Sequence, residues 1–370
     1  MTTLQTITPH FDPWEAYLDV EQHGHMTLSN IEFTTTTLCN MRCAHCAVGY
    51  TLQNKDPEAL PMELITKRLD EIPHLKTLSI TGGEPMMSKK SVQNYVLPLL
   101  KYAHARGVRT QINSNLTIEP ERYLLIAPYL DVLHISHNWG TVDEFVETGF
   151  AMMERKPTYE QRAALFQRMI DNSKMLAEHG VMVSAETMLN KKTLPYLEHI
   201  HNQIINEMHC ARHEVHPMYP SDFASSLSSL SLAETRAAIH HLLDVRDESA
   251  WMLFGTLPFY PCSTDEEDQK LLKRLRETKN VTMRNDPDGR SRLNVNIFTG
   301  DVIVTDFGDA SALGNIVQDK LPAIFDKWMT TDLAKSLNCH CPAVKCLGPN
   351  VLVKNMYYQN TTFTSGSAKL

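Results

Sequence analysis

Three cysteines stand close together near the start of the chain, in the stretch TTLCNMRCAHCAVGY (residues 36–50). Three residues separate Cys39 from Cys43, and two separate Cys43 from Cys46. Thiolates favour zinc or iron–sulfur clusters over hard cations, and a closed structural site of either kind takes four protein ligands. Three thiols therefore indicate either a 4Fe–4S cluster with one open iron or a zinc site with a fourth ligand from elsewhere, such as His45.

Two polar loops follow predicted strands further along the chain. LSITGGEP (residues 78–85) ends an apolar run with Gly82 and Gly83, which let a backbone approach a ligand without a Cβ in the way. Glu84 follows, and its carboxylate suits an ammonium group or the cap of the next helix. QINSNLT ends the next run with small polar side chains, among them Asn115, that can hydrogen-bond a ribose or a carboxylate. Because ligands bind at the carboxyl ends of parallel strands, we expect these loops to meet the cysteine loop.

A second group of cysteines lies near the C-terminus, in NCHCPAVKCLG. Cys339, Cys341 and Cys346 belong to it, and Cys262 stands upstream in FYPC. Together these four thiols are enough to close a second iron–sulfur cluster or, equally, a structural zinc site. Cys210 stands alone near a predicted strand end and is interpreted as a small buried hydrophobic residue.

Alternating strands and helices must position these loops. From about residue 30 to 220, short β-branched runs alternate with helical stretches, which predicts a parallel sheet with right-handed crossovers, either open or curled into a barrel. Of the 17 histidines, His134, His137 and His216 lie near predicted strand ends, and at most one is expected to serve a substrate. The predicted strands are Ile31–Thr37, Lys76–Thr81, Val108–Asn113, Val132–Ser136, Val181–Glu186 and His213–Met218.

The character of the sequence changes after a serine-rich loop, MYPSDFASSLSSLSL. Ser231 and Glu234 have the spacing of a capping box and predict a helix to about Val245. Beyond Pro261, a charged helix and a hairpin turning at Thr299–Asp301 are expected. The predicted regions are an N-terminal extension (1–29), a core (30–225), a helical linker (226–260) and a smaller α+β domain containing the second cysteine group (261–370).

Bulk composition narrows the class of protein. Of the 370 residues, 42% are hydrophobic and 21% charged, as in ordinary globular proteins. A net charge of −8 argues against a nucleic-acid-binding surface or a polybasic membrane anchor. No apolar run approaches the roughly 20 residues that span a bilayer, and the N-terminus lacks the pattern of a signal peptide. We expect a cytoplasmic, reducing setting, in which eight cysteines are metal ligands before they are disulfides.

CxxxCxxC after the first strand, GGEP after the second and an asparagine-containing segment after the third occur here in that order. In this combination the chain resembles the radical S-adenosylmethionine (radical SAM) superfamily over about residues 30–220. The resemblance implies an α/β fold with a partial (β/α)6 TIM-type barrel. It implies reductive cleavage of SAM at the 4Fe–4S cluster to a 5′-deoxyadenosyl radical, which abstracts hydrogen from a substrate. It also supplies the missing ligand, because the amino and carboxylate groups of SAM bind the open iron.

The same resemblance assigns the first three cysteines to the cluster and further residues to SAM. Where the family often has an aspartate two residues after the serine of the fourth strand, this chain has Asn138. The arginine that pairs the SAM carboxylate would be either Arg155 or Arg162. The implied SAM residues are His45 near the adenine, Gly82, Gly83 and Glu84 at the methionyl amino group, Asn115 after the third strand, and Ser136 in HISHN.

The C-terminal part resembles the auxiliary-cluster (SPASM or twitch-like) extensions of radical SAM enzymes. CxCxxxxC also resembles the radical SAM/CxCxxxxC-motif (YfkAB-type) proteins. One auxiliary 4Fe–4S cluster is expected in place of two, because Thr305 and Asp306 stand where the larger extension has a cysteine.

The resemblance further implies an electron donor such as flavodoxin or ferredoxin, and a peptide or protein substrate. A small-molecule substrate or a step of cofactor biosynthesis is the enzymatic alternative. A non-catalytic, zinc-binding regulatory protein is the alternative from another class, although zinc binding gives no reason for GGEP.

Overall fold

The computed structural model describes residues 10–306, 310–337 and 339–363. One sheet of eleven strands forms its centre, in the order β11-β10-β9-β1-β2-β3-β4-β5-β6-β7-β8. From β9 through β1 to β8 neighbouring strands are parallel, and β10 and β11 add an antiparallel edge. The strands are β1 (Asn30–Thr34), β2 (Thr77–Thr81), β3 (Arg109–Asn113), β4 (Val132–Ser136), β5 (Met182–Leu189), β6 (Arg212–Pro217), β7 (Trp251–Gly255), β8 (Val281–Arg284), β9 (Arg292–Asn296), β10 (Asp301–Ile303) and β11 (Gly314–Asn315).

The six strands predicted from the sequence are confirmed as β1 to β6, and β4 has the predicted bounds. Successive side chains point to opposite faces of a strand. In β1, Ile31 and Phe33 are buried in the main hydrophobic core, whereas Glu32 between them lines a cavity on the other face. The predicted α/β fold built on a parallel sheet is therefore present, and its inner face carries polar side chains.

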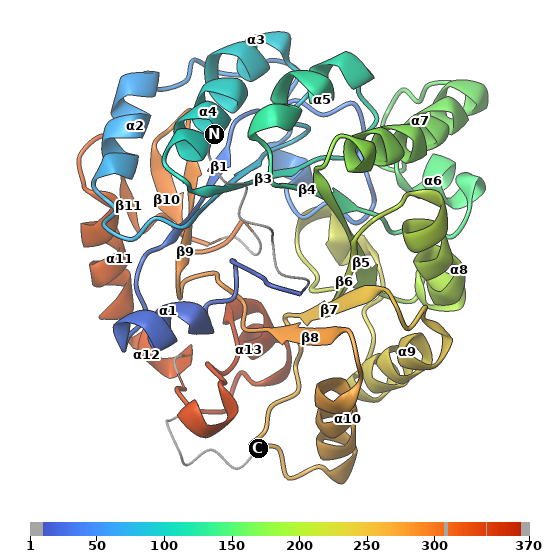
Figure 1. Cartoon of the computed structure of the whole chain (residues 1–370), viewed down its shortest axis with the longest axis vertical. Coiled ribbons are helices and arrows are strands. Elements are labelled where there is room, and N and C mark those ends of the chain that lie inside the picture. Colours follow the sequence, from blue (N-terminus) through green and yellow to red (C-terminus); the bar gives the residue numbers. More distant parts are fainter. Residues whose placement is uncertain (1–9, 307–309, 338, 364–370) are drawn as a thin grey trace.

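Helices cover the outer face of the curved sheet. Figure 1 shows α2 to α8 in an arc outside the strands, with α9 and α10 beyond β7 and β8. Among the described residues, no helix is long and apolar enough to cross a membrane. The helices are α1 (Tyr17–His23), α2 (Met62–Asp70), α3 (Lys89–Ser91), α4 (Leu97–Ala105), α5 (Pro120–Ile126), α6 (Val142–Thr148), α7 (Tyr159–Glu178), α8 (Leu197–Asn202), α9 (Leu232–Val245), α10 (Glu266–Glu277), α11 (Leu321–Met329), α12 (Asp332–Leu337) and α13 (Val351–Tyr357).

Several predicted boundaries rest on local signals that the structure confirms. Ser231 and Glu234 form the predicted capping box at the start of α9. The predicted hairpin is formed by β9 and β10, which pair antiparallel on either side of Thr299. Both signals depend on contacts between residues close in the sequence, which explains why they could be read before the tertiary structure was known.

The segment 226–260 differs from the helical linker expected there, because it also contains β7. All five residues of β7, WMLFG, are buried. A short apolar run without alternation cannot be assigned to strand or helix from periodicity. β7 pairs with β6 and β8, so strands from 226–260 and 261–370 extend the sheet of the core. The limits of the predicted domains stay predictions.

The chain between residue 10 and α1 lies on the inside of the curved sheet (Figure 1). Trp14 is buried, and its indole N–H donates to Ser79 Oγ of β2 over 3.1 Å. Asp12 accepts a hydrogen bond from Arg284 of β8 over 2.5 Å. The described part of the predicted N-terminal extension therefore joins the two halves of the sheet and forms part of the wall of the cavity.

Candidate active site

A cavity of about 310 Å³ lies on the inner face of the sheet. Its volume is within the range of small-molecule sites in proteins. It collects side chains from loops that are far apart in the sequence but adjacent at the carboxyl ends of β1 to β4, as the sequence predicted. The predicted site residues that line it are Cys39, Cys43, His45, Cys46, Gly82, Gly83, Asn115 and Ser136.

The cysteine loop is fixed to α6 and to itself by hydrogen bonds to backbone carbonyl groups. Arg42 donates from Nη1 to the carbonyl of Cys39 over 2.8 Å. The N–H of Ala44 donates to the carbonyl of Thr148, at the end of α6, over 2.9 Å. Burial is the main cause that raises the pKa of the Cys39 thiol to about 12, and the negative charge of Glu84 is the next. Coordination by iron would offset this burial because a bound metal's charge stabilises the thiolate.

Glu84 lies behind the cavity and does not line it. One carboxylate oxygen accepts a hydrogen bond from the backbone N–H of Asn115 over 2.7 Å, and the other accepts one from the N–H of Met86 over 3.0 Å. Ser114 Oγ also donates to this carboxylate, over 2.9 Å. The carboxylate therefore fixes the loop after β3, and only Gly82 and Gly83 of the GGEP segment reach the cavity.

Asn115 joins the loop after β3 to the cysteine loop. Its side-chain amide donates to Asn40 Oδ1 over 3.0 Å and lies 4.0 Å from the sulfur of Cys39. Its amide oxygen accepts from the hydroxyl of Thr117 over 2.7 Å. The predicted third-strand asparagine is thus adjacent to the predicted cluster.

The two glycines are required by close approach of the chain to itself. A Cβ on Gly83 would lie 2.2 Å from the carbonyl oxygen of Leu38, at the start of the cysteine loop. A Cβ on Gly82 would lie 2.3 Å from the carbonyl oxygen of Thr36, and Gly82 has a φ of +141°. The sequence predicted a close approach of a ligand at this point. The structure shows that the same glycines also allow β2 to pack against the cysteine loop.

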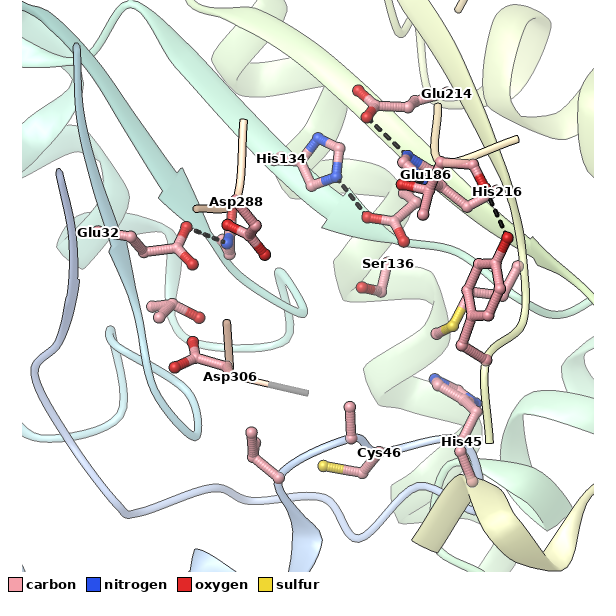
Figure 2. A pocket seen from close by; sticks show the side chains of 18 of the residues that line it. Glu32, His45, Cys46, His134, Ser136, Glu186, Glu214, His216, Asp288 and Asp306 are labelled. Carbon is pink, nitrogen blue, oxygen red and sulfur yellow. Dashed lines mark hydrogen bonds and ion pairs between the residues drawn. The ribbon is translucent and has the colours of Figure 1, made fainter. Parts of the chain in front are cut away.

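His45 is buried in the cavity wall, with its ring centroid 5.5 Å from that of Trp139. Burial lowers the pKa of His45 to about 4, so its ring is neutral at pH 7. Ser136 ends β4 and points into the cavity (Figure 2). Asn138, where the family often has an aspartate, accepts a hydrogen bond from the N–H of Met188 over 2.7 Å and is absent from the cavity lining.

Neither arginine proposed for the SAM carboxylate lines the cavity. Arg155 is exposed, and Arg162 donates from Nη1 to the carbonyl of Val146 over 2.7 Å. Within the described residues, the arginines that line the cavity are Arg284 and Arg292. Both come from the C-terminal half of the sheet, which the sequence placed in another domain.

Most of the polar residues on the inner face of the sheet were not predicted from the sequence. Figure 2 shows Glu32, Asp288 and Asp306 on one side of the cavity, and Glu186, Glu214 and His216 on another. Of the three histidines noted near strand ends, His134 and His216 line the cavity, whereas His137 is buried outside it, 2.9 Å from Gln203. The available signal was a polar residue at alternate positions of otherwise apolar strands, as in His134 and Ser136 of β4.

The C-terminal cysteines gather in one place, as the sequence predicted. Cys339 is buried in a hydrophobic cluster with Tyr219 and Val353, and Cys262, Cys341 and Cys346 pack against it. The sulfurs of Cys339 and Cys341 are 3.6 Å apart.

Two features of this gathering bear on its metal chemistry. Burial, and after it the nearby Cys341 thiol, raises the pKa of Cys262. Within the described residues, no three His, Cys, Asp or Glu side chains converge on a point that would hold a single metal ion. Four thiols are the donor set of an iron–sulfur cluster, whose thiolates bind different iron atoms, and equally that of a structural zinc site.

Comparisons with known proteins identify the family. Residues 33–200 match the radical SAM superfamily, and residues 218–368 match the YfkB-like domain. The protein YfkA of Bacillus subtilis (strain 168) is 72% identical over 368 residues, which cover 100% of this chain and 99% of that protein.

Solved structures show the same fold. Streptococcus suis SuiB has a TM-score of 0.60 at 16% identity, over 95% of this chain and 80% of SuiB. A second SuiB structure, with bound SAM, has a TM-score of 0.59 at 17% identity, over 91% of this chain and 74% of SuiB. The structure of anSMEcpe with bound SAM has a TM-score of 0.55 at 14% identity, over 83% of this chain and 81% of anSMEcpe. With the YfkA match and the two domain matches, the chain belongs to the radical SAM superfamily of S-adenosylmethionine-dependent iron–sulfur enzymes.

Proposed function

We propose that this enzyme binds a 4Fe–4S cluster through Cys39, Cys43 and Cys46 and binds SAM beside it. The observation that carries the proposal is that all three thiols line the same cavity as Asn115 and Ser136. When bound, the cluster supplies an electron that cleaves SAM to methionine and a 5′-deoxyadenosyl radical, which takes a hydrogen atom from the substrate. A flavodoxin or ferredoxin in a reducing, cytoplasmic setting is the proposed electron donor.

The chain's own residues divide the work of binding SAM. Gly82 and Gly83 offer an open backbone beside the thiols. Asn115, whose amide is bonded to Asn40 and Thr117, lines the cavity at the proposed amino-acid end of SAM and holds the cysteine loop there. His45, neutral and packed against Trp139, offers an apolar surface to the adenine. Ser136 supplies a hydroxyl from the end of β4. Glu84 acts as a positioning residue, because its carboxylate holds the loop that carries Asn115.

We further propose that Cys262, Cys339, Cys341 and Cys346 bind a second 4Fe–4S cluster. These four cysteines are named here the C-terminal thiol cluster. Two residues, Tyr219 and Leu352, belong to the hydrophobic cluster around these thiols and also line the cavity. A cluster at this place would lie next to the substrate site. It is therefore positioned either to accept the electron left on the product radical or to fix the substrate.

The proposed substrate is a peptide or protein. One solved SuiB structure, with a TM-score of 0.59 at 14% identity, holds the precursor peptide SuiA. The cavity of the present chain is lined by segments from both halves of the sheet, which suits a substrate that enters between them. A small molecule is the alternative substrate.

The experiment that tests the cluster and SAM assignments is anaerobic reconstitution followed by reduction in the presence of SAM. The wild-type chain is expected to form 5′-deoxyadenosine and methionine, whereas Cys46→Ala is not. Cys210→Ala is the matched control, because Cys210 is buried beside Ser173 and does not line the cavity. Formation of 5′-deoxyadenosine by Cys46→Ala at the wild-type rate would exclude the assignment.

The substrate class is tested with extracts of cells grown in deuterated medium, separated into macromolecules and small molecules. Hydrogen abstraction places substrate deuterium in 5′-deoxyadenosine, which mass spectrometry detects. We expect deuterium from the macromolecular fraction. Deuterium from the small-molecule fraction alone would overturn the peptide or protein substrate.

A further inference from the structure

One side of the cavity carries three carboxyl groups that the functions proposed above do not use. Glu32 comes from the middle of β1, Asp288 precedes β9, and Asp306 follows β10. We call these three residues the carboxylate wall. Figure 2 shows the wall across the cavity from Ser136, with Cys46 and His45 at a third position. A substrate beside SAM would therefore face the wall.

Arg292 is the cation that faces the wall from within the described residues. Its Nε donates to Asp288 over 2.7 Å, and its Nη1 lies 3.9 Å from Glu32. The single guanidinium group of Arg292 is therefore the positive charge shared by the three carboxyl groups of the wall. Asp286 adds a further carboxyl group at the edge of this region, where it accepts a hydrogen bond from Thr256 over 2.7 Å.

Asp306 shows the consequence of this imbalance. Within the described residues it has no hydrogen-bond donor, and its neighbours act on it through their charges. Burial, together with the charges of Glu32 and Asp288, raises the pKa of Asp306 to about 8, although Arg292 opposes the shift. Burial likewise raises the pKa of Asp288 to about 6. The wall would thus gain from another positive charge.

The other polar side of the cavity has no such excess. Glu214 is paired there with Arg284 and also with Arg212, over 3.1 Å to the latter. Burial alone would raise the pKa of Glu214, but these guanidinium groups hold that pKa well below its usual value. His216 lies 2.7 Å from Glu214 and adds a group whose pKa is raised by nearby carboxylates despite burial. Among the described residues that line the cavity, the negative charge of the carboxylate wall is therefore balanced less well than that of Glu214 on the other side.

We propose that the carboxylate wall binds a positively charged nitrogen of the substrate, such as the ammonium group of a lysine side chain or a guanidinium group, and holds the substrate beside SAM. This inference rests on the proposed function, because it takes the cavity as the substrate site. A metal ion fits less well, since no three carboxyl, histidine or thiol side chains of the described residues converge as its ligands do.

The test compares two probes that differ in charge and little in size. Nα-acetyl-lysine amide and Nα-acetyl-norleucine amide are titrated calorimetrically into the reconstituted full-length enzyme saturated with SAM. We expect the lysine compound to bind at least tenfold more tightly at pH 8. Binding should release a proton near pH 7, because a bound cation lowers the pKa of Asp306, and affinity should rise from pH 6.5 to pH 8.5.

Variants distinguish binding by the carboxylate wall from an effect of the protein's overall negative charge. Asp306→Asn and Glu32→Gln should each reduce the preference for the lysine compound, and Asp306→Asn should remove the proton release. Glu277→Gln, an exposed carboxylate at the end of α10, is the matched control and should keep both properties. Circular dichroism establishes that each variant is folded.

The outcomes distinguish this inference from the proposed function. Equal affinity of the wild-type enzyme for the two probes overturns the inference without reference to any variant. Displacement of the lysine compound by MgCl₂ also overturns it, because the wall would then be a metal site. Competition between the lysine compound and SAM overturns it as well, because the cation bound by the wall would then be SAM itself. If the wild-type enzyme cleaves SAM in any of these cases, the proposed function stands and only the cationic substrate is lost.

Discussion

The carboxylate of Glu84 accepts a hydrogen bond from the backbone N–H of Asn115 over 2.7 Å. This bond joins the loop after β2 to the loop after β3, beside the predicted cluster site. Asn115 in turn donates to Asn40 of the cysteine loop. Burial raises the pKa of Glu84 to about 7, although hydrogen bonds from Asn115 and Met86 oppose the shift. One buried carboxyl group thus ties together the loops that the proposed function assigns to SAM.

Replacing Glu84 with glutamine should weaken SAM binding while leaving the iron content unchanged. The amide offers one acceptor oxygen where the carboxylate offers two, so one of the bonds to Asn115, Met86 or Ser114 is lost. At pH 8.5, above the pKa of about 7, the carboxylate is charged, and a buried hydrogen bond to it is worth about 2 kcal/mol; carried in full into SAM binding, its loss raises the Kd for SAM more than tenfold. Equilibrium dialysis with reconstituted enzyme measures it. Glu121→Gln, exposed on α5, should bind SAM normally, and normal binding by Glu84→Gln would contradict the positioning role.

Replacing Gly83 with alanine should disturb the cysteine loop itself. The new Cβ would meet the carbonyl oxygen of Leu38 at 2.2 Å, a contact that backbone movement alone relieves. We expect less iron to be retained on reconstitution, measured by metal analysis. Gly180→Ala is the matched control: its backbone φ of +81° strains an alanine, but the space around its Cβ is open. It should lose about 1 kcal/mol of stability and keep its iron. Equal iron retention by both variants would show that the approach to Leu38 is unimportant.

Removing Cys39, Cys43 and Cys46 together should leave a second cluster in place. We expect the triple alanine variant to hold about four iron atoms per chain after reconstitution, bound by the C-terminal thiol cluster. Metal analysis and the visible spectrum measure this.

The complementary variant, Cys341→Ala with Cys346→Ala, should keep the iron of the SAM site. It should also be cleaved faster by protease after residue 260, because metal binding stabilises a fold whose ligands come from two segments. Zinc in place of iron in the triple variant would make the C-terminal site structural. Full iron retention by Cys262→Ala would remove Cys262 from the ligand set.

A pair of buried histidines should make the fold sensitive to acid. His201 Nε2 accepts a hydrogen bond from the N–H of Asp247 over 3.1 Å, so its Nδ1 carries the proton donated to His213 Nδ1 over 2.9 Å. His213 then donates from Nε2 to Thr187 Oγ1 over 3.0 Å. This chain of bonds has no place for an added proton. Burial lowers the pKa of His201 to about 4 and that of His213 well below its usual value.

Both pKa values are depressed in the folded state, so the unfolded chain binds more protons as the pH falls below about 6.5. The stability present above that pH is lost as the pH falls toward 4. His201 alone should account for a loss of roughly 2 kcal/mol between pH 7 and pH 5. Urea unfolding at both pH values measures it. His201→Gln should flatten the dependence and His25→Gln, at an exposed position, should not. A dependence unchanged in His201→Gln would contradict the explanation.

The sequence by itself determined the features that depend on neighbouring residues and on strand order. Alternating β-branched runs and helices gave β1 to β6, because side-chain periodicity reports local structure. The order of the strands then brought Cys39, Gly83 and Asn115 together, because parallel strands present their carboxyl ends at one edge. The four thiols of the C-terminal thiol cluster were also recognised from their number and spacing.

Only the tertiary structure decided what lies opposite these residues. β7 was missed because its five residues are buried on both faces, which leaves no alternation in the sequence. The direction of Glu84, away from the cavity and toward Asn115, depends on competing hydrogen-bond donors that packing brings within reach. The carboxylate wall joins Glu32 to Asp288 and Asp306, which lie more than 200 positions later, because β9 pairs with β1. Charge balance in a buried cavity is a sum over residues from distant segments, and the sequence does not contain that sum in any local pattern.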